Sequence, residues 1–173
     1  MSRLARRLYA RWFNATAQHK AEGHWWYKRA RRDARRMARL HGCTLSTAAG
    51  VIAALSPRLH WDVNLRAAER LLGSEDVTGV FMDNLVKAQR IFAGERPLSV
   101  LSGPKVRAFY RAILGQDAAV VDVWVARAAG IQRELTPQRY SEAARALTQA
   151  ARMAGVPTTT LQATVWVAER GRP

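Results

Sequence analysis

The sequence predicts an all-α protein that folds as one domain. Apolar residues recur at intervals of three and four through most of the chain, and glycine or proline residues separate these periodic stretches. Only residues 120–125 (VVDVWV) are rich in β-branched residues, and one short strand cannot build a sheet. A chain of 173 residues suits one domain with a sizeable core, so we expect a helical bundle of seven to nine helices with short connections.

Residues 1–44 are expected to form two basic amphipathic helices. Leu4 and Leu8 lie at helical spacing in the first, and Ala34 and Met37 do so in the second. Arginines occupy many of the positions between the apolar residues. Each helix therefore has an apolar stripe for the core and a basic face for solvent.

The middle of the chain contains three further helices. The stretch CTLSTAAGVIAALSP is an almost wholly apolar core helix that Thr44 or Ser46 can cap and that Pro57 brings to an end. The stretch WDVNLRAAERLLG reaches Gly73 at its C-terminal cap, and VFMDNLVKAQRIF is followed by Gly94. These glycines mark where each helix stops.

The last helices are punctuated in the same way. In LSGPKVRAFYRAILG a glycine-proline pair opens a basic helix and Gly115 closes it. Residues 131–173 form the C-terminal helices, of which the first has Thr136 as N-cap, Pro137 at the first helical position and Gly155 at its end. The stretch TTTLQATVWVAERG is the final helix.

The net charge of +15 predicts a polyanionic partner, and nucleic acid is the leading candidate. Residues 1–40 hold twelve basic residues and only two acids, for a net charge of +10. The twelve are Arg3, Arg6, Arg7, Arg11, Lys20, Lys28, Arg29, Arg31, Arg32, Arg35, Arg36 and Arg39. A solvated helix face or an acidic membrane surface would also explain such a run, although the apolar positions here are committed to a core.

Several classes of protein and site are not expected from this sequence. No stretch approaches 18 uncharged apolar residues, and MSRLARRLYARWF lacks the apolar region of a secretory signal, so we expect a cytoplasmic protein. Cys43 is the single cysteine, which excludes an internal disulfide and a cysteine-rich ligand set. The four histidines lack metal-ligand spacing. We therefore expect no metal and no cofactor.

Asp122 is an acid inside an apolar run, and two interpretations account for it. As the N-cap of a following helix, VWVARAAG, its carboxylate would accept hydrogen bonds from free backbone N–H groups. Alternatively, the helix that begins at Pro104 can grip a phosphate through its N-terminal N–H groups and through Lys105, Arg107 and Arg111. A carboxylate just beyond that grip would lie close to the sugar.

This region resembles the helix-hairpin-helix DNA glycosylase superfamily, whose members remove bases from DNA. The family hairpin reads roughly L-P-G-x-G-x-K-x-A, continues through a helix to a glycine, and reaches an aspartate in a V-D-x-x-V-x-R context. The similar positions here are Leu101, Gly103, Lys105, Gly115, Val121, Asp122, Val125 and Arg127. VIAALSPRLHWDVNLRAAERLL is similar to the family's apolar helix, L-S sequence and following helix, and NLVKAQRIFAG to its N-K-A-x-x-I helix. The resemblance covers about residues 45–130 and implies a glycosylase-like core with a DNA-binding helix-hairpin-helix element.

The resemblance also implies catalytic roles. Asp122 would act near the anomeric carbon, either by activating water or by stabilising the positive charge on deoxyribose as the base leaves. Lys105 would be the amine nucleophile of a bifunctional enzyme or a phosphate contact. Because LSGPKV lacks the family's second glycine, we favour the phosphate contact.

DNA contacts and a base pocket follow from the same resemblance, because a base must leave the stack to react. The DNA-binding candidates are Gly103, Lys105, Arg107, Arg111, Arg31, Arg32, Arg35, Arg36 and Arg58. The pocket candidates are His60, Trp61, Asn64, Trp124 and Gln162, for which helix packing, capping or a surface position is the alternative. Residues 24–27 (HWWY) offer stacking surfaces beside the arginines, although aromatic residues at helix starts usually pack in a core.

The sequence thus leads us to expect a DNA-binding hydrolase that flips a base and cleaves its glycosidic bond without cutting the strand. Small arginine-rich chains of this kind resemble bacteriophage or bacterial proteins, for which modified bases are plausible substrates. Two alternatives stay open: a DNA base-modification enzyme on the same fold, in which Asp122 orients a nucleophile, and a non-enzymatic DNA-binding protein, in which Asp122 only caps.

Overall fold

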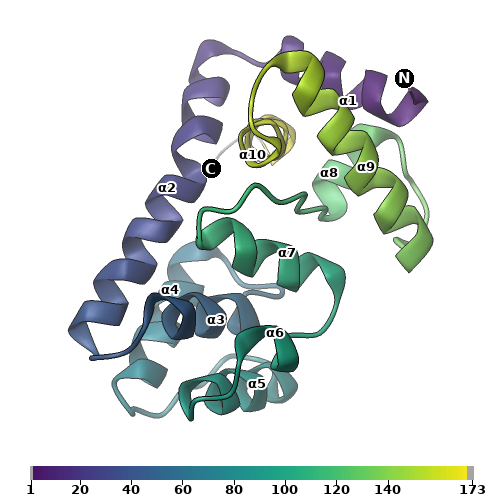
Figure 1. The fold of residues 1–173 in the computed structure, drawn as a ribbon. Coiled ribbons are helices and arrows are strands. Elements are labelled where there is room, and N and C mark those ends of the chain that lie inside the picture. The colour runs from purple at the N-terminus through teal and green to yellow at the C-terminus, as the bar shows by residue number, and fades with distance from the viewer. Residues whose placement is uncertain (1, 171–173) are drawn as a thin grey trace. The chain divides into compact units, whose positions relative to one another are not determined.

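The computed structural model describes residues 2–170, and ten α-helices account for most of them (Figure 1). They are α1 (Arg3–Phe13), α2 (Ala17–Leu40), α3 (Leu45–Leu55), α4 (Trp61–Leu72), α5 (Met82–Phe92), α6 (Pro97–Val100), α7 (Pro104–Ile113), α8 (Val123–Ala129), α9 (Pro137–Ala154) and α10 (Thr158–Arg170). The all-α prediction is confirmed, since no strand occurs within the described residues. The count exceeds the expected range because α6 is a single turn, too short to show a periodic pattern.

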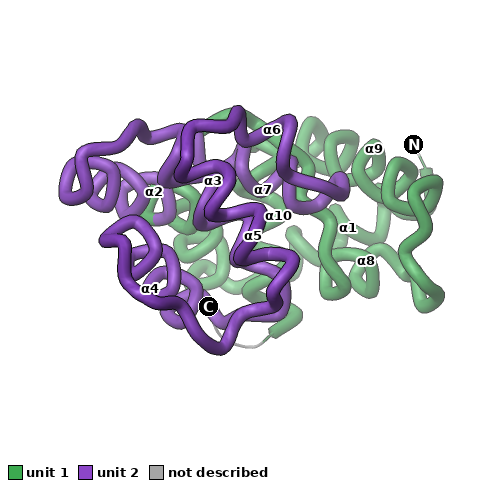
Figure 2. The backbone as a smooth tube through the Cα atoms, turned by 90° about the horizontal axis from the view of Figure 1, so that it is seen from below, with its two compact units in different colours: residues 1–29, 115–173 green, residues 30–114 purple. Residues whose placement is uncertain are grey.

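The chain divides into two compact units (Figure 2). Unit 1 comprises residues 1–29 and 115–173, and unit 2 comprises residues 30–114. The long helix α2 begins in unit 1 and ends in unit 2. Each unit has its own hydrophobic core and is described by itself.

In unit 2 the apolar helix α3 is packed by α4, α5, α6 and α7. Every residue from Ala48 to Leu55 is buried, as its near-continuous apolar sequence predicts. Gly50 is the point of closest approach, because a Cβ there would lie 2.9 Å from Ile91 Cγ2 and 2.9 Å from Pro97 Cγ. A glycine at this position allows α6, the turn before the predicted hairpin, to lie directly on α3.

In unit 1 the last helix, α10, is packed by α1, α8 and α9. Leu161 and Val165 are fully buried, and several polar residues of the same helix are buried too. Gly23 of α2 lies against this helix, because a Cβ at Gly23 would lie 2.5 Å from the backbone nitrogen of Thr164. The backbones of α2 and α10 therefore approach closely at this glycine.

The helix ends follow the predicted capping signals. Thr44 Oγ1 accepts a hydrogen bond of 3.0 Å from the Thr47 N–H at the start of α3, which decides between the two candidate caps. Thr136 caps α9, whose first residue is proline, and Gly155 ends it in a left-handed conformation at φ 67°. Residues 120–125 do not form a strand, because the chain passes from an extended segment into the first turn of α8.

Candidate active site and nucleic-acid interface

The turn between α6 and α7 consists of Leu101, Ser102 and Gly103 and lies where the sequence predicts the hairpin. Gly103 is the N-cap of α7 with φ 78°, a conformation that glycine adopts without strain. Lys87 Nζ, from α5, donates a hydrogen bond of 2.7 Å to Ser102 Oγ. The turn is therefore tied to the helix that the sequence analysis matched to the family's N-K-A-x-x-I helix.

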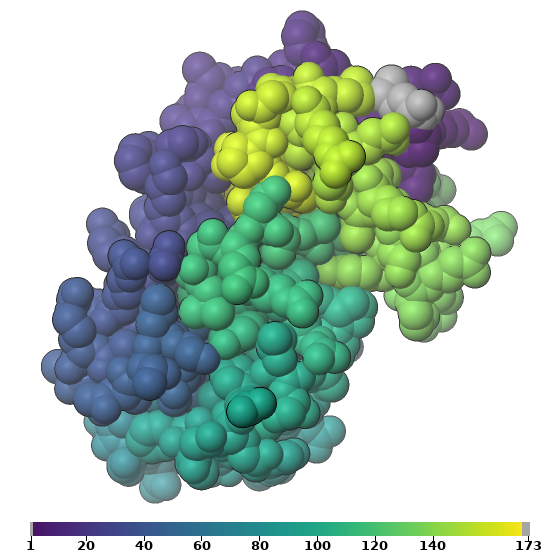
Figure 3. Space-filling view, in the orientation of Figure 1, coloured from purple at the N-terminus to yellow at the C-terminus, as the bar shows by residue number. Residues whose placement is uncertain are grey.

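The basic side chains of α7 are exposed at the positions expected of a phosphate grip. Lys105, Arg107 and Arg111 all lie at the surface, and residues 101–115 form part of the visible face in Figure 3, where they are green. Arg107 Nη2 donates a hydrogen bond of 2.9 Å to the carbonyl oxygen of Leu98 in α6, which braces the turn. Lys105 has no ion-pair or hydrogen-bond partner among the described residues.

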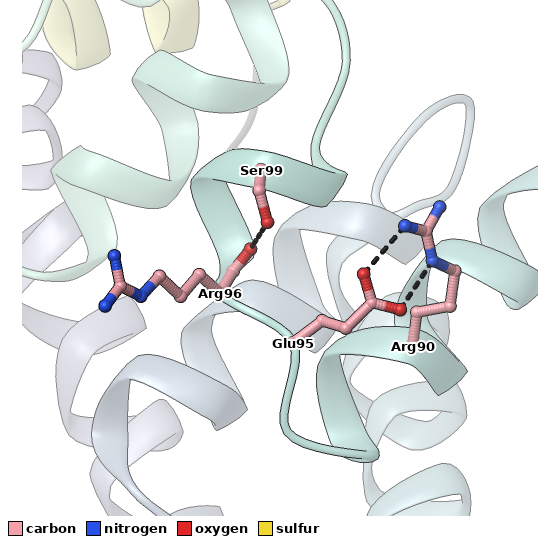
Figure 4. A network of polar contacts seen from close by, with 4 residues as sticks. All are labelled: Arg90, Glu95, Arg96 and Ser99. Carbon is pink, nitrogen blue, oxygen red and sulfur yellow. Dashed lines mark hydrogen bonds and ion pairs between the residues drawn. The ribbon is translucent and has the colours of Figure 1, made fainter.

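Polar contacts fix the connection between α5 and α6 (Figure 4). Arg90 and Glu95 form a bidentate pair, with distances of 2.7 Å from Nε to Oε1 and from Nη2 to Oε2. The hydrogen bond from Arg90 lowers the pKa of the Glu95 carboxyl. Ser99 Oγ donates a hydrogen bond of 2.7 Å to the Arg96 carbonyl oxygen within the turn of α6. Arg90 is thus already neutralised by a partner within the protein.

Three predicted pocket residues lie at the start of α4 in unit 2. His60 is the exposed N-cap and makes no side-chain capping bond. Trp61 is half-buried and packs edge-on against Phe109 of α7, with ring centroids 6.2 Å apart. Asn64 is only 1% exposed, and its Nδ2 donates to the Ile52 carbonyl oxygen at 3.1 Å. Trp61 and Asn64 therefore have packing and bracing contacts, and His60 faces solvent.

Arg58 lies in a strained loop next to exposed apolar residues. Its φ of 64° is unusual for a residue with a side chain. The guanidinium Cζ lies 5.6 Å from the ring centroid of Phe81, which is 50% exposed and adjoins the 69% exposed Met82. This edge of unit 2 therefore combines an arginine with uncovered apolar surface.

The four predicted DNA-binding arginines of α2 differ in their surroundings. Arg32 and Arg35 are exposed, and Arg35 has no ion-pair partner in the described part of the chain. Arg36 Nη1 lies 3.2 Å from Glu69 Oε1, so that part of its charge is neutralised. Arg31 is half-buried, and its Nε is buried with no hydrogen-bond partner among residues 2–170. Arg32 Nε lies 3.9 Å from Asp33 Oδ1, a longer ion pair than that of Arg36, so Arg35 and then Arg32 are the most available for phosphate.

Asp122 is the N-cap of α8 in unit 1, as the structural interpretation predicted. A single oxygen, Oδ1, accepts both capping bonds, from the N–H of Trp124 at 3.0 Å and of Val125 at 2.9 Å. The other oxygen, Oδ2, accepts no hydrogen bond from any described residue, and the side chain is half-buried. Capping therefore uses half of the carboxylate and leaves one oxygen available.

The charge of this carboxylate acts on two buried tyrosines. Burial and, to a lesser degree, the negative charge of Asp122 raise the pKa of Tyr27, so the phenol stays protonated. The pKa of Tyr140 is also raised. Burial is the main cause and the charge of Asp122 adds to it, whereas the hydrogen bond from the Val121 N–H acts in the opposite direction. Its hydroxyl donates to the Ala119 carbonyl oxygen at 3.0 Å, which fixes the segment that leads into Asp122.

Gln162 and Trp124 are the predicted pocket residues of unit 1. Gln162 is 4% exposed, and its Oε1 accepts a hydrogen bond of 2.8 Å from the Tyr27 hydroxyl. Trp124 is half-buried beneath the guanidinium of Arg127, at 5.3 Å from the ring centroid. Gln162 of α10 is therefore paired with Tyr27 of α2, the tyrosine whose pKa the Asp122 charge helps to raise.

Comparison with known proteins gives a family without a function. A family model described as a family of unknown function (DUF7178) matches residues 1–173. The chain belongs to this family. No curated protein and no solved structure matches it. The relationship of this DUF7178 member to the helix-hairpin-helix glycosylases thus stays a prediction.

Two further properties of the DUF7178 chain concern ligands and membranes. Within residues 2–170 no cluster of three or more histidine, cysteine, aspartate or glutamate side chains is suited to hold a metal ion. None of the described helices is both long and apolar enough to cross a membrane.

Sequence reasoning missed the two tyrosines of the site. Tyr27 ends the HWWY motif, which was considered only as a stacking surface. Tyr140 lies three residues before Ala143 on the buried face of α9 and has the spacing of an ordinary core residue. The one available signal was a hydroxyl on an otherwise apolar helix face, which needs a partner when it is buried.

Proposed function

We propose that this protein binds DNA and cleaves the glycosidic bond of a base within it. The proposal depends mainly on one observation, which is that the two oxygens of the Asp122 carboxylate differ in their hydrogen bonds. Oδ1 holds the start of α8, while Oδ2 accepts no hydrogen bond from the described residues. The charge of Asp122 contributes to the raised pKa values of Tyr27 and Tyr140, so both phenols lie within its electrostatic reach.

The surroundings of Asp122 suit a charged carboxylate that acts on a developing cation. The backbone N–H groups of Trp124 and Val125, in the first turn of α8, donate to Asp122 Oδ1 and hold the carboxylate in place. Burial, and to a lesser degree the charge of Asp122, raises the pKa of Tyr27 and of Tyr140, so both phenols stay neutral. Oδ2 can then accept a proton from an attacking water or stabilise the positive deoxyribose as the base departs.

DNA binding is supported by charge and by the surface of α7. The net charge is +15, and Lys105, Arg107 and Arg111 are exposed after a glycine turn. The first N–H groups of α7 and these cations are the groups that usually contact phosphate. Lys105 then acts as a phosphate contact, and the enzyme is monofunctional.

Incubation of the pure protein with oligonucleotides tests the proposal. The strands carry uracil, oxidised, alkylated or hypermodified bases, and the products are weighed by mass spectrometry. Loss of a base supports glycosidic cleavage, and Asp122→Asn should remove that activity. Conversion of the base without its loss would instead favour a base-modification enzyme. Retention of every base together with tight binding would leave a DNA-binding protein in which Asp122 is only a cap.

A further inference from the structure

Unit 1 carries an unusual number of aromatic rings covered by cations. The pairs are Lys20 over Trp12 at 4.7 Å, Lys28 over Trp25 at 4.5 Å, Arg127 over Trp124 at 5.3 Å and Arg170 over Trp166 at 4.6 Å. Such pairs occur about once per 70–80 residues in ordinary proteins. Unit 1 is of roughly that size, so it holds several times the usual number.

Trp25 differs from the other three tryptophans because its ring is largely in solvent. It is 51% exposed, whereas Trp12, Trp124 and Trp166 are half-buried. The next residue, Trp26, packs against Trp166 with ring centroids 4.8 Å apart. Packing therefore accounts for Trp26 but leaves the exposed indole of Trp25 unexplained.

Two neighbours on the same helix flank the Trp25 indole. The His24 ring stands perpendicular to it, with an interplanar angle of 87° and centroids 5.1 Å apart. Lys28 Nζ lies 4.5 Å from the indole centroid and 2.7 Å from His24 Nε2. The three side chains thus form a small cluster in which an aromatic face adjoins a cation.

The charge around this cluster determines which partner fits. Residues 1–29 contain seven basic residues and one acid, and Lys28 carries a positive charge at the cluster itself. An apolar protein surface would gain nothing from that charge, and a basic one would be repelled. A nucleotide complements both parts, because its base has a flat apolar face and its phosphate is an anion.

We propose that Trp25, with His24 and Lys28, is a stacking platform for an unpaired nucleobase of single-stranded DNA. The inference rests on the proposed function, to which it adds the strandedness of the nucleic acid. A base that stacks on the indole replaces an exposed cation–π contact by a stronger stacking contact. Lys28 then becomes available for the neighbouring phosphate. Paired bases in a duplex already stack on each other and offer no free face, so the platform selects single strands.

Binding to a short labelled single strand and to the duplex of the same sequence tests this inference. Trp25→Ala should weaken single-strand binding by roughly 5- to 150-fold, the loss of one stacked base, and leave duplex binding unchanged. Trp25→Tyr keeps an aromatic ring and should restore most of the affinity. Lys28→Gln should lower the single-strand log–log salt slope by about 0.7. Phe13→Ala is the matched control, because Phe13 is 63% exposed in the same unit and has no cation over its ring among the described residues.

Four results would overturn the inference. They are unchanged single-strand binding by Trp25→Ala and Lys28→Gln, an equal loss for strand and duplex, an equal loss in Phe13→Ala, and a dimer seen in sedimentation that Trp25→Ala dissociates. If duplex binding and base removal persist in the first case, the platform fails and the proposed function stands. If the wild-type protein binds neither form of DNA, both fail together.

Discussion

Helix α10 of unit 1 buries polar as well as apolar side chains, whereas the buried residues of helix α3 in unit 2 are all apolar. Helix α10 buries Thr158, Gln162 and Thr164 along with its leucine and valines. Helix α3 buries alanines, a glycine, two aliphatic β-branched residues and Leu55. The buried polar side chain in the described part of unit 2, Asn64, lies on α4 and bonds to the backbone of α3.

We interpret this difference as one of function: unit 1 holds the candidate catalytic residue, and unit 2 holds the residues proposed to bind phosphate. Buried polar groups are costly unless they are paired, so they gather where a function or a fold-specifying network requires them. In unit 1 the buried Gln162 accepts a hydrogen bond from Tyr27, whose pKa the charge of Asp122 helps to raise. In unit 2 an apolar core holds a rigid turn and presents cations at the surface. We assign base chemistry and the stacking of an unpaired base to unit 1, and the phosphate contacts of α7, Arg32 and Arg35 to unit 2.

The strongest test of this contrast is Asp122→Asn. An amide can still cap α8, but it can neither carry the charge nor accept the proton, so turnover should fall by about 10²- to 10⁴-fold. DNA affinity and the melting temperature should change little, because an Asp to Asn exchange at an N-cap costs little. Single-turnover kinetics on the substrate found by mass spectrometry, beside a binding titration, would measure both quantities.

Asp117→Asn is the matched control for this variant. Asp117 also lies in unit 1 and accepts hydrogen bonds at a helix start, from the Thr159 N–H at 3.0 Å and the Thr159 hydroxyl at 3.3 Å. Burial opposes ionisation of Asp117, but the hydrogen bonds from Thr159 and Thr158 outweigh it and lower its pKa. Asp117→Asn should keep full turnover. Equal losses in the two variants would show that both carboxylates are only caps.

Replacement of Arg32 and Arg35 by alanine tests the binding assigned to unit 2. If about five phosphates are neutralised, the wild-type log–log salt slope should be about −4 to −5, and the double variant should reduce it by roughly 1.8. All DNA sequences should weaken alike, because phosphate contacts carry no sequence information. Addition of Arg31→Ala and Arg36→Ala should reduce the slope further.

Arg90→Gln provides the control for charge alone. Arg90 is in the same unit but is already paired with Glu95 at 2.7 Å, so its loss should leave the slope unchanged. A wild-type slope near zero would remove nucleic acid as the partner. A normal slope in the double arginine variant would make α2 an ordinary solvated face.

Two glycines allow each unit to be disturbed separately. Gly23→Ala would place a Cβ 2.7 Å from the Thr164 Cα, and Gly50→Ala would place one 3.0 Å from the Pro97 Cβ. Each should lower the free energy of unfolding by about 1–3 kcal/mol through overpacking. Gly23→Ala should also reduce turnover, whereas Gly50→Ala should reduce DNA affinity because α6 leads into the hairpin.

Thermal melts and the two functional assays separate these effects. Gly79→Ala is the control, because Gly79 has φ 75° but no atom within 4 Å of an added Cβ, so it reports backbone strain alone. The same functional loss in Gly23→Ala and Gly50→Ala would break the division between the units.

Local features of this fold could be predicted from the sequence, and long-range ones could not. Thr136 could be predicted as a cap, Thr44 as one of two candidates with Ser46, and Asp122 as a cap in one of its two interpretations, because a cap bonds to groups only two or three residues away. The Tyr27–Gln162 hydrogen bond joins residues 135 positions apart, and no spacing rule connects them. The polar environment of Asp122 was therefore missed, although the residue itself was found.

The region around the turn between α6 and α7 also combines local features that could be predicted with a long-range contact that could not. Gly103 and the basic residues of α7 could be identified from turn chemistry and helix spacing. The one-turn α6 could not be, because four residues display no periodicity and only Pro97 at its start marked it. Its position on α3 depends on Gly50, which in sequence is only a glycine inside an apolar helix.

The smallest expected effect concerns Lys105, whose two candidate roles predict opposite results. A nucleophilic lysine passes through a Schiff base, so borohydride would trap a covalent protein–DNA adduct. Such an amine must be neutral, which requires burial or a close cation, and Lys105 is exposed in the first turn of α7. We therefore expect no adduct. Lys105→Gln should reduce the salt slope by roughly 1, and Lys105→Arg should retain it, because arginine keeps the charge. A trapped adduct that maps to Lys105 would move chemistry into unit 2 and end the separation of roles between the two units.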